Sequence, residues 1–380
     1  MEQFFVTYLT IKNIRHLKNI SIPLSDGKIK HLILTGKNGS GKTSVVEALA
    51  KYLDLIVRGS RENAFQNCQK ELDIKLNNKI DSIPELTWKY NYILAYYKAD
   101  RVFQAEQPKH IEKVQLKDSY ELTEFPRMEF VKYLLDLKMT EALARSNNKA
   151  EKADEIHAWF AQLEQLLKQI FDDETVKLEF DEETYEFYIL QQGKEPFGFN
   201  TLSSGYQAVL DIVLDIMMRM QRQIQRSFDF KLSGIVLIDE IEAHLHLELQ
   251  KNFLPFLTKI FPNIQFIVTS HSPFILNSIS NAVIYDLEKQ TLVEHGLGNI
   301  PYDGIVEGYF KVDKLSEILR EKFERYKELV YKENLLDDEL GEIAELEFYL
   351  DEVPDYLAIG ITTEYQKMKV EFMNREDIDG

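Results

Sequence analysis

The chain has 380 residues, 44% of them hydrophobic, which is enough for one large or two medium globular domains with buried cores. Its 45 Lys and Arg residues against 63 Asp and Glu residues leave a formal net charge of −18, which repels nucleic acid at long range, so contact with DNA would need a local basic patch or a partner chain. One cysteine excludes an intramolecular disulfide, no apolar run approaches the ~20 residues that span a bilayer, and no leader pattern begins the chain, so we expect a cytoplasmic protein without membrane contact.

The first strong signal is a phosphate-binding turn near the N-terminus. Residues 4–24 alternate apolar and polar side chains as strands do, and residues 32–34 read as a buried strand followed by a loop and a helix. Between that strand and the helix, the stretch GKNGSGKT at residues 36–43 completes the pattern G-x-x-x-x-G-K-[ST]. The match is complete and lies in the strand-to-helix context that the pattern requires, so a chance glycine turn is disfavoured.

This pattern predicts the binding of ATP with Mg²⁺. Glycines let backbone N–H groups converge on phosphate oxygens, and the following helix directs its positive end at the same anion. In this motif the lysine, Lys42, reaches the β- and γ-phosphates and the hydroxyl of Thr43 ligates Mg²⁺. The residues expected to bind the nucleotide here are Gly36, Lys37, Asn38, Gly39, Ser40, Gly41, Lys42, Thr43 and Ser44.

A second strand-like run ends near residue 98 in the sequence LAYYKADRVFQ, residues 94–104. Asp100 and Arg101, and more weakly Gln104, are candidates for neighbours of the γ-phosphate or the metal. A solvated turn explains the same residues equally well, so both interpretations stay open.

A helical insertion is predicted at about residues 105–172. Residues 126–145 and 151–171 read as two antiparallel helices joined by a turn at residues 146–148. The second helix carries an apolar stripe, most simply explained as core packing. Its members are Ile156, Trp159, Phe160, Leu163, Leu166, Leu167 and Ile170. A helix of ~20 residues spans only ~30 Å, so the insertion is a short lid rather than a long arm.

Residues 200–207, NTLSSGYQ, lie between a stretch that alternates like a strand, residues 176–190, and a long apolar run, residues 208–218. By itself such a loop needs to be no more than a helix cap with Ser204 as the N-cap residue. The helix behind it nevertheless points its positive end outward at an anion. Whether the loop is a turn or half of a nucleotide site depends on the motifs that follow.

A buried strand at residues 235–238 runs into Asp239 and Glu240. In a parallel sheet such a strand delivers both carboxylates to its C-terminal edge, where ligands bind. Asp239 would hold Mg²⁺ through water, and Glu240 would orient and polarise the attacking water. Beyond them, His244 and His246 would diverge on a helix at their spacing, so a metal site there is disfavoured.

Another apolar strand, residues 264–268, ends in Thr269, Ser270 and His271. A histidine just past a strand end in an α/β sheet stands where ligands bind. A neutral imidazole there could hydrogen-bond the γ-phosphate or the attacking water.

In this order the motifs resemble the ABC-type ATPase fold, particularly the branch with the RecF, SMC and OLD-nuclease ATPase heads. The resemblance is specific over residues 1–50 and 198–290. In that family the loop at the position of LSSGYQ faces the γ-phosphate bound by a second protomer. The resemblance therefore implies that Ser203, Ser204 and Gly205 complete a site whose Lys42 belongs to another chain.

Two departures from the family pattern are visible, and one family residue has no placed counterpart. Ser204 stands where glycine is commonest, and Tyr206 follows where a polar residue is common. The glutamine of the family's Q-loop cannot be assigned.

After residue 305 the sequence becomes helical and strongly charged, in residues 313–353 and again in residues 363–380 beyond a break at 354–360. No effector motif is present there. We expect either a docking or self-assembly element or a helical cap on the ATPase core. The expected domain limits are 1–310 for the ATPase domain and 311–380 for the C-terminal region.

The predicted fold is α/β, with a mixed ABC-type sheet, an antiparallel lobe on its N-terminal side, the helical insertion and the helical C-terminal region. The resemblance implies Mg²⁺-dependent ATP hydrolysis, with Lys42, Glu240 and His271 as catalytic residues, at two composite sites in a head-to-tail dimer or a larger oligomer. ATPases of this size in the branch resemble the ATPase subunits of anti-phage systems such as Septu and PARIS, which hold or license a separate effector, often a nuclease. A RecF-like DNA-repair ATPase, disfavoured by the charge, and an ATP-locked scaffold with little turnover are the alternatives.

Overall fold

The computed structural model describes residues 3–25, 27–58, 62–77, 92–101, 103–221, 228, 230–294, 296–297, 317–333, 335–351 and 359–373. The chain divides into two compact units, Met1–Ile300 and Pro301–Gly380, each of which is described by itself. The domain limit expected at residue 310 lies outside the described residues. None of the described helices is both long enough and apolar enough to cross a membrane.

A mixed sheet forms the centre of the first unit. Its strands, in order across the sheet, are β11 (Thr291–Val293), β10 (Ala282–Asp286), β3 (His31–Thr35), β9 (Ile264–Thr269), β8 (Gly234–Ile238) and β5 (Ile93–Tyr97). The neighbouring pairs are parallel except for β10 with β11. Strands β3, β8 and β9 are buried along their whole length, as expected of parallel strands covered on both faces. The carboxyl ends of β3, β9, β8 and β5 therefore lie at one edge of the sheet.

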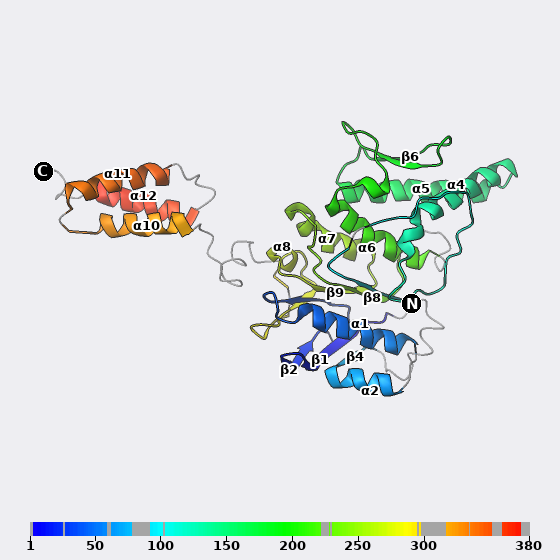
Figure 1. Ribbon diagram of the computed structural model, residues 1–380, viewed down its shortest axis with the longest axis horizontal. Helices are drawn as coiled ribbons and strands as arrows, with labels where there is room; N and C mark the ends of the chain where they lie inside the picture. Colours follow the sequence, from blue (N-terminus) through cyan, green and yellow to red (C-terminus); the bar gives the residue numbers. More distant parts are fainter. Residues whose placement is uncertain are drawn as a thin grey trace. The chain divides into compact units, whose positions relative to one another are not determined.

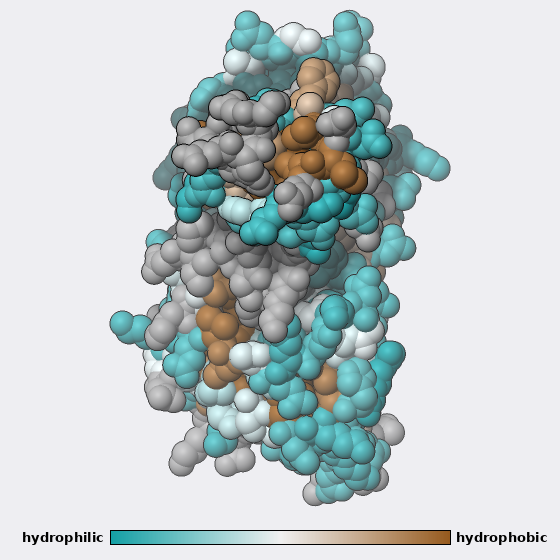
Figure 2. Space-filling view, turned by 90° about the vertical axis from the view of Figure 1, so that its left-hand side faces the viewer, coloured by the Kyte–Doolittle hydropathy of each residue, from teal (hydrophilic) through white to brown (hydrophobic). Residues whose placement is uncertain are grey.

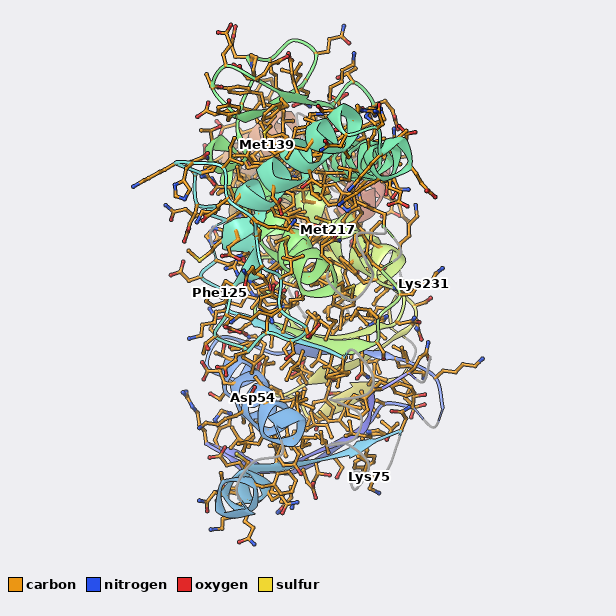
Figure 3. The ribbon with its side chains drawn as sticks, turned by 90° about the vertical axis from the view of Figure 1, so that its right-hand side faces the viewer. Asp54, Lys75, Phe125, Met139, Met217 and Lys231 are labelled. Atoms are coloured by element: carbon orange, nitrogen blue, oxygen red, sulfur yellow. The ribbon has the colours of Figure 1, made fainter. Side chains whose placement is uncertain are left out.

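Helices cover both faces of this sheet, with α1 on one side and α6 and α7 on the other (Figure 1). Their bounds are α1 (Lys42–Arg58), α6 (Ser204–Met220), α7 (Leu247–Ile260) and the short α8 (Pro273–Leu276). Beyond α1 lies a second, antiparallel sheet with strand order β2 (Leu17–Pro23), β1 (Val6–Ile14) and β4 (Leu72–Leu76), packed against α2 (Glu62–Glu71). Helix α1 is thus buried between two sheets, which explains its continuous apolar core contacts. Figure 3 shows this order of layers, from Lys75 in β4 through Asp54 on α1 to Met217 on α6.

The insertion lies over α6. Its predicted range, about residues 105–172, contains the 3₁₀ turn η2 (Pro126–Glu129), α4 (Phe130–Ser146) and α5 (Ala150–Phe171). The hairpin of β6 (Lys177–Phe180) with β7 (Phe187–Leu190) and the 3₁₀ turn η3 (Phe199–Thr201) follow it in the chain. The apolar stripe of α5 is buried as expected, with Phe160 only partly covered. The stretch at 176–190 that alternates like one strand is two short strands. Because α6 is covered by the sheet on one side and by the insertion on the other, nearly all its side chains after Gln207 are buried.

The second unit has three described helices with a core of their own. They are α10 (Glu317–Val330), α11 (Asp337–Asp351) and α12 (Ile359–Met373). Their buried core consists of Phe323, Tyr326, Leu329, Val330, Ile343, Leu346, Leu350, Tyr365 and Met368. Helix α12 begins at Ile359, so the break expected to reach residue 360 ends earlier.

Candidate nucleotide-binding and catalytic site

The loop that joins β3 to α1 has the backbone of a phosphate cradle. Gly36, Gly39 and Gly41 have φ angles of 131°, 84° and 97°, a region that residues with a side chain rarely adopt. A Cβ atom at Gly36 would lie 2.8 Å from the Oγ atom of Ser40, and one at Gly41 would lie 2.8 Å from a methyl of Leu17. At these two positions glycine is therefore required by both the backbone angle and the available space.

Lys42 is the first residue of α1 and folds back over this loop. Its Nζ atom donates hydrogen bonds to the carbonyl oxygens of Gly36, at 2.7 Å, and Lys37, at 3.2 Å. The side chain is 6% exposed, so an ammonium group lies buried inside the turn of the cradle. A buried cation with only neutral carbonyl partners among the described residues is suited to an anion in the same loop.

The other predicted residues of the loop differ in their surroundings. The ammonium of Lys37 pairs with the carboxylate of Glu288 at 3.1 Å on the rim, and Asn38 is exposed. Ser40 is buried, and its hydroxyl has no partner among the described residues. Ser44 is half-buried in the first turn of α1.

A chain of hydrogen bonds joins the first turn of α1 to the ends of the neighbouring strands β8 and β9. The Thr43 hydroxyl donates to Oδ2 of Asp239 at 2.8 Å, and the Thr269 hydroxyl donates to Oδ1 of Asp239 at 2.6 Å. The same Thr269 oxygen accepts the backbone N–H of Glu240 at 2.7 Å. Thr269 was recognised in the sequence as a strand end without a role; a hydroxyl one strand away from paired carboxylates is the signal that could have assigned it.

The residues at this edge fit Mg²⁺. The Thr43 hydroxyl and the Asp239 carboxylate are hard oxygen ligands, and they meet beside the phosphate cradle. The donor set that the sequence predicts for the metal is therefore brought together by the fold.

Glu240 follows in a left-handed backbone conformation with a φ angle of 45°. Such a conformation costs a residue with a side chain about 1–3 kcal/mol and persists only where its surroundings enforce it. Within the described part of the chain, the Glu240 carboxylate makes no hydrogen bond or ion pair. The backbone of this residue is held while its carboxylate remains available.

His271 lies at the end of β9 and is paired with a carboxylate that the sequence analysis missed. Its Nδ1 atom is 2.9 Å from Oε1 of Glu242, and its backbone N–H donates to the same oxygen at 2.7 Å. The hydrogen bond to Glu242 raises the pKa of His271 above its usual value, which favours the protonated imidazole over the neutral form expected from the sequence. Burial alone would raise the pKa of Glu242, but the hydrogen bonds from His271 outweigh it and hold that pKa low. The charges of Lys42 and Glu240 also act on His271, which places all three at one edge.

The loop at residues 200–207, which we call the signature loop, is arranged differently from the expectation. Ser203, not Ser204, is the N-cap residue of α6, with extended angles of φ −62° and ψ 154°, and its hydroxyl makes no capping bond. Ser204 opens the helix, and both serines are exposed. Gly205 is buried, where a Cβ atom would lie 3.1 Å from the carbonyl oxygen of His244. No hydrogen bond joins either serine to residues 36–43 in the described chain.

Three further residues discussed from the sequence have clear positions. Arg101, a candidate neighbour of the γ-phosphate or the metal, is 5% exposed, and its guanidinium donates to the backbone carbonyls of Asp239 and Glu240. His246 is the N-cap of α7 and accepts the N–H of Leu249, while His244 lies in the preceding loop. No group of three or more potential metal-ligating His, Cys, Asp or Glu side chains occurs among the described residues.

Comparison with known proteins shows the family of the chain. Residues 32–277 match the family described as AAA domain, putative AbiEii toxin, Type IV TA system. The chain belongs to this family. The match begins in β3 and ends just after α8, so it includes the phosphate cradle, the signature loop and both polar strand ends.

Several relatives are named as defence proteins or ATPases. Septu protein PtuA of Bacillus mycoides (strain KBAB4) is 26% identical over 96% of this chain and 53% of its own length. Retron Ec83 probable ATPase of Escherichia coli is 35% identical over 36% of this chain and 26% of its own length. Thus the chain spans about half the length of the first relative and about a quarter of the second. Among solved structures, the SMC head bound to the C-winged helix domain of ScpA aligns with a TM-score of 0.41 and 16% identity over 74% of this chain and 93% of that one. The resemblance to ATPases of anti-phage systems is confirmed by the named relatives.

Proposed function

We propose that the chain is a Mg²⁺-dependent ATPase whose sites close between two copies, and that it regulates a separate effector in anti-phage defence. The observation that carries the ATPase proposal is the junction of Thr43, Asp239 and Thr269, with the Glu240 carboxylate beside it. A phosphate cradle, a hard metal-binding pair and an available base lie on neighbouring strand ends. No other arrangement in the described chain combines these three elements.

In the proposed reaction each residue has a distinct task. The loop N–H groups and Lys42 would hold the phosphates, and Thr43 with Asp239 would hold Mg²⁺, which would neutralise negative charge on the phosphates. Glu240 accepts a proton from the attacking water as the water oxygen bonds to the γ-phosphorus, while the bond from that phosphorus to the β–γ bridging oxygen breaks and ADP leaves. His271, held at Nδ1 by Glu242, presents its other ring nitrogen to the γ-phosphate or to the water.

The dimer proposal rests on the exposed serines of the signature loop. Ser203 and Ser204 stand at the positive end of α6, a helix of 17 residues, and their hydroxyls have no partner in the described chain. Such a helix end attracts an anion. We therefore propose that it faces the γ-phosphate held by another copy, as the family resemblance implies.

Purified protein tests the ATPase proposal directly. We expect phosphate release from ATP that stops with a chelator and returns with added Mg²⁺. Thr43→Ala, which removes the hydroxyl ligand, should need more Mg²⁺ for half-maximal rate, while Ser146→Ala, an exposed serine at the end of α4, should not. Absence of hydrolysis with tight ATP binding would support the scaffold alternative instead.

The C-terminal helices are the proposed docking region for the effector. On α11, Leu340, Ala344 and Phe348 repeat every four residues on the side away from its buried core residues, and Phe348 is 70% exposed. Figure 2 shows one face of the molecule, on which apolar side chains are open to solvent between hydrophilic ones. An exposed apolar stripe of this kind is typical of a binding site.

Charge indicates which kind of partner fits this stripe. Every charged residue of α11 is Asp or Glu. Although Glu339, Glu342, Glu347 and Asp351 pair with basic side chains of the same unit, the helix itself supplies no positive charge to a second copy packed through it. A partner helix with apolar side chains flanked by Lys or Arg complements both features. The charge of α11 therefore favours a different protein over a second copy as the partner. Because ATP is supplied in the cytoplasm, we propose the cytoplasm as the place of action.

The protein encoded beside this gene is the probe for that proposal. If it is a nuclease, we expect it to co-purify with the unmodified chain and not with Phe348→Asp. The matched control is Leu143→Asp, which changes an equally exposed leucine on α4. A replication or repair protein as neighbour, or capture unaffected by Phe348→Asp, would overturn the effector proposal, the former in favour of RecF-like work.

A further inference from the structure

Arg101 holds the turn that carries the catalytic carboxylate. Its Nη1 atom donates to the carbonyls of Lys98, at 2.9 Å, and Asp239, at 2.8 Å. Its Nη2 atom donates to the carbonyls of Glu240 and Ile241, both at 2.9 Å. One planar guanidinium therefore ties the end of β5 to consecutive carbonyls after β8. A lysine could not reproduce this, because its ammonium is a point charge on a flexible stem.

The N–H groups of the same turn are also fully engaged. The N–H of Asp239 donates to Tyr97, at 2.8 Å, and those of Glu240 and Ile241 donate to the hydroxyl and the carbonyl oxygen of Thr269, at 2.7 and 3.1 Å. Strands β5 and β9 thus fix one side of the turn, and Arg101 fixes the other. Because Glu240 has a strained φ angle of 45°, the loss of either side should let its backbone relax.

The buried face of α6 carries a carboxylate that connects to Arg101. Asp211 is fully buried; its Oδ1 atom accepts from Arg127, and its Oδ2 atom has no hydrogen-bond partner among the described residues. Burial raises the pKa of Asp211 to about 6, and the positive charges of Arg127 and Arg101 oppose that rise. Arg101 likewise has one donor, Nε, that is buried and without a partner in the described chain. Two opposite charges with spare hydrogen-bonding atoms thus act on each other from α6 and from the loop after β5.

The position of Asp211 along α6 connects its interaction with Arg101 to the signature loop. Asp211 lies seven residues after Ser204, which is about 10 Å along the helix axis at 1.5 Å per residue. One turn further, Asp215 accepts the hydroxyl of Tyr97 at 2.8 Å, so α6 is anchored on β5. Helix α6, which begins at the signature serines, is therefore connected to β5, the strand that precedes Arg101.

We propose that Arg101 is a positioning residue for Glu240 and that Asp211 links it to α6, so that ATP of another copy engaged at the signature serines changes turnover at this copy's own Glu240. When α6 is drawn towards that anion, Asp211 moves with it and closes on the free donor of Arg101. The catalytic turn is then held most firmly when both sites are filled. This inference rests on the proposed ATPase function and names its regulation.

Arg101→Lys and Asp211→Asn test the two steps, each in the full-length chain. Arg101→Lys should bind ATP as the unmodified chain does but lower kcat by about 10- to 100-fold, because a misplaced general base loses part of its 10²–10⁴-fold contribution. Asp211→Asn should lower the Hill coefficient for ATP hydrolysis towards 1. The control is Asp136→Asn, a buried aspartate on α4 that accepts from Thr140 and Val114 away from the site.

A double variant separates a link from two unrelated defects. If Asp211 acts through Arg101, adding Asp211→Asn to Arg101→Lys should change kcat little further, whereas independent effects multiply. Asp136→Asn should leave the Hill coefficient unchanged. Normal kcat in Arg101→Lys, or multiplied effects in the double variant, would overturn the inference. An unmodified chain without hydrolysis would instead contradict the proposed function, so the two failures are distinguishable. If Arg101→Lys does not fold, the Hill coefficient of Asp211→Asn still decides.

Discussion

The two halves of the proposed nucleotide site differ in how they are held. On the cradle side, Lys42 and Asp239 are buried, and Lys42, Thr43 and Asp239 all have hydrogen-bond partners in the same chain. On the signature side, Ser203 and Ser204 are exposed and their hydroxyls contact nothing in the described chain. Both halves are helix starts near the same sheet, so secondary structure does not explain the contrast.

A buried polar group without partners is costly, whereas an exposed one is satisfied by water. One chain can therefore form the cradle by itself, and the serines of the signature loop can remain hydrated until an anion binds. We infer that binding of ATP belongs to one copy and closure of the site to two. The following predictions test that division, from the largest expected effect to the smallest.

Lys42→Ala should abolish ATP binding by a single copy. The substitution removes the buried cation of the cradle, and each lost charge-assisted hydrogen bond costs about 1.5–3 kcal/mol. Titration calorimetry measures the result. The control is Lys28→Ala, which removes an exposed ammonium outside the loop and should bind nearly normally. Retained affinity in Lys42→Ala would show that the cradle is not the ATP site.

Glu240→Gln should leave ATP bound and slow its hydrolysis by about 10²–10⁴-fold, the range typical of a lost general base. The amide keeps the shape of the side chain and leaves Asp239 in place. Phosphate release and ATP affinity are measured on the same sample. Glu288→Gln, at the rim of the cradle, is the control and should hydrolyse ATP at a near-normal rate. A fast Glu240→Gln enzyme would remove this residue from the mechanism.

Ser204→Arg tests whether the signature loop serves another copy. Placed in the Glu240→Gln background, it should prevent the ATP-dependent rise in mass that Glu240→Gln alone shows by light scattering. The reason is that a bulky cation would fill the gap meant for the γ-phosphate, while ATP binding by one copy stays intact. Ser146→Arg in the same background is the control, because that serine is exposed at the end of α4. If the double variant still assembles with ATP, the loop is only a turn.

The sequence predicted the strands and the loop of the cradle side, but few of the hydrogen bonds that hold its residues in place. The motifs placed β3, β8 and β9 correctly because buried parallel strands are continuous apolar runs with polar ends. Adjacency of those strands is not written in the chain, and only the order β3-β9-β8 brings Thr269 between Thr43 and Glu240. Hydrogen bonds between strand ends, such as those of Thr269, can be predicted only when the order of the strands in the sheet is known.

The residues that sequence reasoning misjudged are those whose role depends on burial. Arg101 follows a strand as a phosphate ligand would, but its backbone partners after β8 are 138 to 140 positions away in the chain. Glu242 received no role from the sequence, yet it is buried and pairs with His271. The N-cap residue is Ser203 and not Ser204. The cap differs from the first helical residue in its backbone angles, and a sequence with two adjacent serines does not show which of them has the extended conformation.

The pair of Glu242 and His271 gives the smallest expected effect, a pH-dependent contribution to stability on the cradle side. The raised pKa of His271 adds stability that is complete below its ordinary value of 6.5 and is lost as the pH rises through the higher folded value. The lowered pKa of Glu242 adds stability that is complete above 4.5 and is lost as the pH falls through the lower folded value. The pair should therefore stabilise the fold most between these two ordinary values.

Glu242→Gln should accordingly lower Tm most near pH 5.5–6, within the window set by those pKa shifts, and less at pH 8.5. Since the imidazole is half-exposed, solvent screening limits the pair to at most about 1 kcal/mol, which corresponds to a shift of about 2–4 °C for a domain of 150–250 residues. Thermal unfolding at both pH values measures the difference, with Glu248→Gln, an exposed acid on α7, as the control. An equal loss at both pH values would mean that Glu242 stabilises the edge only by accepting the backbone N–H of His271, a bond that does not titrate in this range, and that the imidazole is free to turn towards the nucleotide.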